Sequence, residues 1–189
     1  MRDEVKLIVK EMESLATDRA KAAVSKFVPG SSRAIGVSMP DINKLAVKYQ
    51  EGGFKLVNAL WKSGVFEARM LAGKILQRIG KLDPDETLTL IEKFSKDIDN
   101  WAICDCLGSQ STQKVRKTHR NEVFSLSRKL IRSTNLWQRR LALVLLEGYT
   151  RDETARKDIE KIMEVVKNDK EYYVKKAIEW LNRNFEKKR

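Results

Sequence analysis

Two side chains near the middle of the chain, an indole and a carboxylate, have the types and the spacing to act on a cation. Trp101 and Asp105 lie four residues apart, so a helix would place them on one face. A tryptophan ring attracts cations to its face, and a carboxylate held away from water stabilises positive charge that develops during a reaction. The pair therefore predicts a site for a ligand whose reacting centre is cationic.

Further aromatic and basic side chains follow towards the C-terminus and supply groups that bind anions. Trp137 opens an expected helix and is followed by Arg139 and Arg140, and Trp180 lies one turn beyond Lys176. Arginine binds phosphate through a bidentate fork. With the indole and the carboxylate, these residues would suit a ligand with an anionic backbone. Spacing alone leaves a structural alternative open, in which the tryptophans anchor the core and the aspartate is a helix cap or a salt-bridge partner.

The elements that must position these residues are predicted to be helices throughout. Apolar residues recur at helical spacing along the chain, and no segment alternates apolar and polar residues convincingly over the length of a strand. Asp83, Pro84 and Glu86 together form a typical helix start, and Pro40 marks another. We therefore predict an all-α protein in which 28–38 and 108–118 are the longest weakly patterned stretches.

The sequence also carries a weak internal period. Segment 67–72 resembles 137–142, which lies 70 residues further on, and 172–177 follows after another 35 residues. A period of this length in a helical chain is typical of stacked helix pairs, an α-solenoid, with a compact bundle as the alternative. Because no linker is long enough to divide the chain, a single domain over residues 1–189 is predicted.

Composition narrows the choice of partner. The 189 residues carry a net charge of +12, with 42% apolar and 34% charged residues. Such a field attracts polyanions, nucleic acid first and an anionic membrane surface second. We expect no membrane binding, because no apolar run reaches transmembrane length and the basic last helix lacks a wide apolar face. The charged residues 1–15 also lack the apolar core of a signal peptide.

The few cysteines and histidines argue against a metal centre. Cys104 and Cys106 are separated by one residue, which gives no disulfide framework, and with His119 they fall short of the four ligands of a structural zinc ion. No glycine-rich phosphate-binding loop is present. We expect no metal and no cofactor, a reducing cytoplasmic compartment with association to the nucleoid through DNA, and a monomer.

Five short motifs follow one another in register from residue 36 to residue 180. They are Gly36-Val37-Ser38-Met39-Pro40-Asp41, Leu60-Trp61 with Glu67-Ala68-Arg69, Asp99-Asn100-Trp101-Ala102-Ile103-Cys104-Asp105, Asn135-Leu136-Trp137-Gln138-Arg139-Arg140-Leu141-Ala142, and Val174-Lys175-Lys176-Ala177-Ile178-Glu179-Trp180. In this order they resemble the DNA alkylation repair glycosylases built of HEAT-like helical repeats, the AlkD family. The first 34 residues match none of the family's motifs.

The resemblance implies a C-shaped α-solenoid whose basic concave face holds duplex DNA. It also implies hydrolysis of the N-glycosidic bond of positively charged N3- or N7-alkylated purines. The family's catalytic aspartate matches Asp105, and its accompanying tryptophan matches Trp101. The predicted DNA and substrate contacts, from the resemblance or from residue type and neighbourhood, are Arg140, Trp180, Trp137, Arg139 and Lys176.

The chemistry of such a reaction agrees with the residues present. A cationic base departs as a neutral molecule, so no general acid is needed, while the sugar becomes oxocarbenium-like and needs a nearby negative charge. A second class of function stays open, a non-catalytic helical-repeat module that binds nucleic acid or protein. The set of Trp101, Asp105 and Arg140 discriminates the two, because a scaffold would have no need of a carboxylate inside a basic groove, where it repels phosphate.

Overall fold

A computed structural model describes residues 1–31 and 33–187, and the part it describes is helical without any strand. The α-helices are α1 (Arg2–Ser14), α2 (Asp18–Phe27), α3 (Met39–Tyr49), α4 (Gly53–Lys62), α5 (Phe66–Ile79), α6 (Pro84–Phe94), α7 (Trp101–Asp105), α8 (Arg120–Leu130), α9 (Leu136–Leu146), α10 (Glu153–Glu164) and α11 (Tyr172–Glu186). Short 3-10 turns connect several of them, and a π-helix, η3 (Cys106–Ser111), continues α7. The all-α prediction is confirmed.

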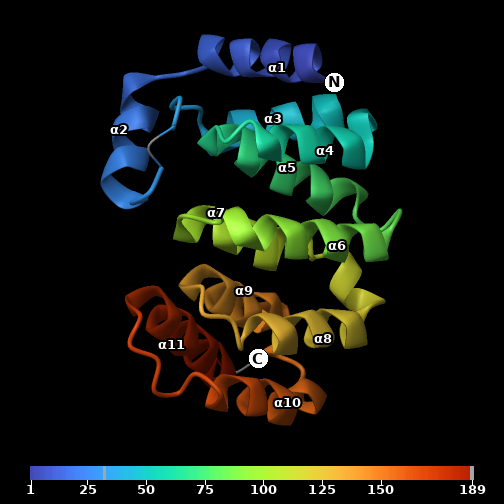
Figure 1. The fold of residues 1–189 in the computed structure, drawn as a ribbon, viewed down its shortest axis with the longest axis vertical. Coiled ribbons are helices and arrows are strands. Elements are labelled where there is room, and N and C mark those ends of the chain that lie inside the picture. Colours follow the sequence, from blue (N-terminus) through green and yellow to red (C-terminus); the bar gives the residue numbers. More distant parts are fainter. Residues whose placement is uncertain (32, 188–189) are drawn as a thin grey trace.

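The helices stack along one axis, from α1 at one end to α10 and α11 at the other (Figure 1). One helix of each repeat begins at Phe66, Trp101, Leu136 or Tyr172, which are 35, 35 and 36 residues apart. Hydrogen bonds join neighbouring repeats with nearly the same offset. Lys93 Nζ, for example, donates to Asn58 Oδ1, 35 residues away, over 3.0 Å. The predicted α-solenoid is confirmed, and the compact bundle is not the arrangement found.

Side-chain caps fix where the repeat helices begin. Asp83 accepts a hydrogen bond from the Glu86 amide at 2.9 Å, as its position before Pro84 predicts. Asn100 caps α7 through the Ile103 amide at 3.0 Å. Asn135 caps α9 by accepting a hydrogen bond from the Trp137 amide at 2.8 Å. The caps at Asn100 and Asn135 set the start of α7 and α9, the helices that carry Asp105 and Arg140.

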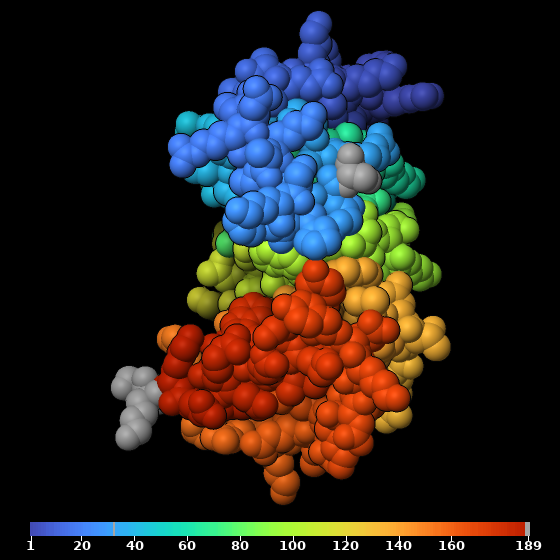
Figure 2. Space-filling model, turned by 90° about the vertical axis from the view of Figure 1, so that its left-hand side faces the viewer, coloured from blue at the N-terminus to red at the C-terminus, as the bar shows by residue number. Residues whose placement is uncertain are grey.

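The elements that carry the predicted site residues reach one side of the stack. Helices α2, α7, α9 and α11 all reach the left-hand side of Figure 1. Figure 2 shows this side face on, with the blue N-terminal and the red C-terminal segments in front and green surface from the middle of the chain between them. Residues that are distant in the sequence therefore line one side of the molecule.

The π-helix η3, which overlaps the start of the weakly patterned stretch 108–118, packs closely against both neighbouring repeats. The π-helix η3 carries Gly108, and a Cβ atom there would lie 2.7 Å from Val144 Cγ1 and 2.9 Å from Val144 Cβ on α9. On its other side, Ser111 Oγ donates to the Gly73 carbonyl of α5 at 2.9 Å. Since π-helical turns interrupt the regular apolar period, sequence patterning did not reveal this element. No helix in the described part of the chain is long and apolar enough to cross a membrane.

This close approach generates a stability prediction. Replacing Gly108 with alanine should lower the free energy of unfolding by about 1–3 kcal/mol, because the new methyl group collides with the branched Cβ of Val144. Urea unfolding measures the loss. The control is Asn121→Ala on the exposed face of α8, where little change is expected. Stabilisation by Gly108→Ala, as helix propensity alone would give, would show that the repeats are not in tight contact here.

Candidate active site at the Asp105–Arg140 pair

A carboxylate and a guanidinium from neighbouring repeats form the centre of the candidate site. Arg140 Nε donates to Asp105 Oδ1 at 3.0 Å, and Arg140 Nη2 donates to Asp105 Oδ2 at 2.9 Å. The third nitrogen, Nη1, donates to the Tyr173 carbonyl at 2.7 Å. One arginine side chain therefore ties α7, α9 and the start of α11 together.

The two charges are buried to different degrees. The Arg140 side chain is 7% exposed, whereas the Asp105 side chain is 23% exposed. Burial raises the pKa of the Asp105 carboxyl above its ordinary value, and the Arg140 guanidinium opposes this by lowering it. The carboxylate thus keeps an open edge, while the guanidinium directs each of its nitrogens to protein acceptors.

Trp101 links α7, the helix that also carries Asp105, to the N-terminal part of the chain. Its half-buried indole donates through Nε1 to the Phe27 carbonyl, at the end of α2, over 3.0 Å. Between α2 and helices α3, α5 and α7 lies a largely apolar cavity of about 390 Å³. Both Trp101 and Asp105 form part of its wall, with apolar side chains such as Val24 and Met70. The indole and the carboxylate therefore line one largely apolar cavity, as their helical spacing predicts.

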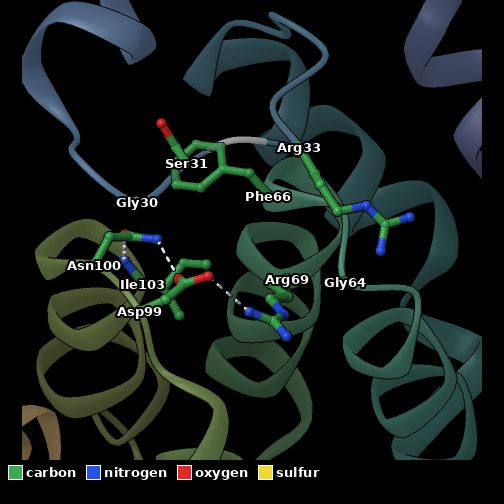
Figure 3. A pocket seen from close by; sticks show the side chains of 9 residues that line it. All are labelled: Gly30, Ser31, Arg33, Gly64, Phe66, Arg69, Asp99, Asn100 and Ile103. Carbon is green, nitrogen blue, oxygen red and sulfur yellow. Dashed lines mark hydrogen bonds and ion pairs between the residues drawn. The ribbon is translucent and has the colours of Figure 1, made fainter.

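A second, polar pocket of about 150 Å³ lies beside the cavity, with Phe66 between them. Figure 3 shows Arg33 and Arg69 on one side of it and Asp99 on the other. Arg69 Nη1 lies 3.5 Å from Asp99 Oδ2. The other carboxylate oxygen of Asp99, Oδ1, accepts a hydrogen bond from Asn100 Nδ2 at 2.7 Å. The charges of this pocket are thus partly balanced within the protein.

Trp137 and Arg139 pack against the start of α11 and the loop before it. The Trp137 ring lies 4.9 Å from the Tyr173 ring, centroid to centroid. Arg139 Nε donates to Asp169 Oδ2 at 2.6 Å, and Arg139 Nη1 donates to the Ser133 and Thr134 carbonyls at 3.0 and 2.9 Å. Both side chains hold internal structure in this conformation. Their contact with DNA stays a prediction.

The two remaining predicted residues lie on α11. Trp180 is half-buried against the core, two turns beyond Tyr173 on the same face of the helix. Lys176 is exposed, and its Nζ pairs with Glu179 Oε2 at 2.9 Å. The structure brings Asp105, Arg140 and the start of α11 into contact, whereas the approach of Trp180 to Asp105 stays a prediction.

Sequence reasoning missed two contributors, Phe27 and Tyr173, because each offers a backbone carbonyl. Any residue type carries that group, so the sequence holds no signal for it. Within the described ranges, no cluster of three or more histidine, cysteine or acidic side chains is arranged to hold a metal ion. Cys104 and Cys106 are both buried, and burial raises the pKa of each thiol, that of Cys106 to about 12.

Comparison with known proteins places the chain in a family. No curated protein sequence matches it. The family described as "DNA alkylation repair enzyme" has a model that matches residues 8–189. This range takes in each of the predicted site residues and all helices from α2 onward. The chain therefore belongs to the DNA alkylation repair enzyme family.

Proposed function

We propose that the protein is a DNA glycosylase that hydrolyses the N-glycosidic bond of positively charged N3- or N7-alkylated purines in duplex DNA. The observation that carries this proposal is the Asp105 carboxylate. It is oriented by two hydrogen bonds from Arg140 and lies with Trp101 in the wall of a largely apolar cavity. Few arrangements suit a developing sugar cation better than a fixed negative charge of this kind.

In the proposed reaction, the bond between C1′ and the purine nitrogen breaks first. Its electron pair goes to the cationic base, which leaves neutral and needs no proton. Positive charge moves to the sugar, where Asp105 stabilises it. Water then adds to C1′ and gives up a proton. The raised pKa of Asp105 makes the carboxylate a stronger base than an ordinary aspartate for orienting and deprotonating that water.

The other residues have graded roles in this proposal. Arg140 acts on Asp105 as a positioning residue, and a phosphate contact would require its guanidinium to exchange a protein acceptor for the phosphate. The faces of Trp101 and Trp180 hold the nucleotide. Trp137 and Arg139 act through the loop and helix start that they support. Lys176, which is exposed, contacts backbone phosphate in this proposal.

A net charge of +12 supports duplex DNA as the partner. As part of the same proposal, the protein binds DNA as a monomer, in the cytoplasm and on the nucleoid. The ion pair also gives the competing function a specific support. A non-catalytic repeat module could use the same Asp105–Arg140 pair as a staple between repeats. Release of modified bases separates the two functions.

Asp105→Asn tests the catalytic assignment. The amide is nearly isosteric but lacks the negative charge, so excision should fall by roughly two to three decades. Affinity for undamaged duplex should hold or rise, because a repulsion with phosphate is removed. Chromatography of bases released from methylated duplex DNA measures the first effect, and a titration with unmodified duplex measures the second.

Two outcomes would count against this assignment. Equal excision by wild type and Asp105→Asn would remove Asp105 from catalysis. A wild-type protein that binds duplex DNA but releases no alkylated base would favour the non-catalytic module.

The acid side of the pH–rate profile tests the charge state. Excision requires Asp105 as a carboxylate, and its raised pKa places the loss of activity above the ordinary aspartate value of about 3.9 as the pH falls. Arg140→Gln removes a cation that lowers this pKa, so the midpoint should move to still higher pH. Single-turnover rates against pH, normalised for each protein, measure it. A midpoint that stays or moves down in Arg140→Gln would contradict the pairing.

A further inference from the structure

We propose that Glu67 is a positioning residue for this reaction, which seats α2 over the cavity beside Asp105 and thereby holds Trp101. The inference rests on the proposed glycosylase function for its effect on excision. Apart from its place in a motif, nothing in the sequence assigns Glu67 a role, and it lies on α5, a different helix from that of Asp105.

Glu67 is a fully buried carboxylate that binds the backbone of a distant loop. Its side chain is 0% exposed. Oε2 accepts from the Ile35 amide at 2.8 Å, and Oε1 accepts from the Gly36 and Val37 amides at 2.7 and 3.3 Å. Charge-assisted hydrogen bonds of this kind are strong, and a concave run of amides is a natural anion seat. The carboxylate therefore dictates the conformation of loop 35–37.

The loop that Glu67 holds in turn holds the start of α2. The Gly36 carbonyl accepts from the Thr17 amide at 2.9 Å, and Thr17 caps α2 by accepting from the Ala20 amide at 3.2 Å. Gly36 has a φ of +104°, and a Cβ atom there would lie 2.8 Å from the Thr17 carbonyl oxygen. Only glycine allows this conformation and this close approach together.

The other end of α2 is held by the site itself, through the bond from Trp101 Nε1 to the Phe27 carbonyl at 3.0 Å. Between these ends, α2 has no buried residue. It covers the apolar cavity rather than filling it. The placement of α2 therefore depends strongly on contacts at its ends, one organised by Glu67 and one donated by Trp101.

This arrangement links Glu67 to the reaction by a short chain of contacts. If loop 35–37 relaxes, α2 loses its seat at Thr17, and the Phe27 carbonyl no longer fixes the indole of Trp101. The cavity wall then opens to water, which weakens the electrostatic effect of Asp105. Misplacement by about 1 Å is sufficient for large rate losses in enzymes, so the expected effect is on the rate of the chemical step.

The first test compares Glu67→Gln with a matched destabilising variant at the opposite edge of the stack. Glu67→Gln replaces one accepting oxygen with an NH₂ group that faces amide donors. Thr87→Val removes bonds from a buried hydroxyl to the Gly80 and Asp83 carbonyls, at 3.2 and 2.8 Å. At a temperature where both variants are folded, single-turnover excision should fall roughly tenfold to a hundredfold in Glu67→Gln only. Affinity for duplex DNA should stay within about twofold of wild type in both, because α2 is not a predicted phosphate contact. Equal excision rates in the two variants would overturn the proposal.

A double-mutant cycle tests the route through Trp101. Trp101→Phe keeps an aromatic ring but removes the N–H that binds the Phe27 carbonyl. If Glu67 acts by that route, the double variant Glu67→Gln/Trp101→Phe should have nearly the same excision rate as the less active of the two single variants. Independent, multiplying losses would overturn the proposed route.

A further variant and a readout without catalysis complete the design. Gly36→Ala disturbs the contact between loop 35–37 and Thr17 without changing Glu67, and it should show the same loss of excision. It takes the place of Glu67→Gln if that variant does not fold. Amide exchange over residues 18–27 should rise at least about tenfold in either variant relative to Thr87→Val. If the wild type releases no base, the proposed function fails, while amide exchange still tests whether Glu67 holds α2 in place. Unchanged exchange over residues 18–27 would overturn the proposal that Glu67 holds α2.

Discussion

The contact on which the candidate site depends is the bidentate pair between Asp105 and Arg140, two charges from neighbouring repeats. Removing one partner of such a buried pair leaves the other charge uncompensated, typically at about 3–5 kcal/mol. The two partners are buried unequally. The guanidinium is enclosed by protein, whereas part of the carboxylate is exposed to the cavity. A fixed anion with one open edge is suited to a ligand that becomes cationic.

The solenoid supplies the geometry for this pair. Consecutive repeats are offset by 35 or 36 residues, so groups at equivalent positions on neighbouring helices come side by side. Arg140 extends the contact by donating to the Tyr173 carbonyl, which fixes the start of α11 relative to α7. Close approach at Gly108, where no Cβ fits against Val144, brings the repeats near enough for these short bonds. The electrostatics of the site therefore depend on the packing between repeats.

Much of the fold could be predicted from local patterns, and the site could be predicted only in part. Asp83 and Pro84 mark a helix start by their own chemistry, and the 35-residue period appears in the spacing of similar segments. The pairing of Asp105 with Arg140 could be approached only as one of two alternatives, because salt-bridge partners and catalytic carboxylates are the same residue type. Here the structure adds the partner and leaves the catalytic role as a proposal.

Other features left no trace that a single sequence can show. The carbonyl of Phe27 that receives the Trp101 indole has no residue-specific signal. The π-helix over Cys106–Ser111 interrupts the regular apolar period and overlaps the weakly patterned stretch 108–118, so the sequence pattern does not predict it. Arg139 illustrates the opposite problem, since an arginine beside a tryptophan suits phosphate, yet in this conformation its guanidinium binds Asp169 and two carbonyls. Residue type predicts what a side chain can bind, and tertiary contacts decide what it does bind.

The central claim is that Asp105 presents a fixed negative charge to the sugar of the damaged nucleotide. Two duplexes test it most directly, one with a cationic pyrrolidine in place of the sugar ring and one with a neutral tetrahydrofuran at the same position. Wild type should bind the cationic analogue at least about tenfold more tightly, because it resembles the transition state, and Asp105→Asn should lose that preference. Equal affinity of the wild type for the two duplexes would contradict the claim.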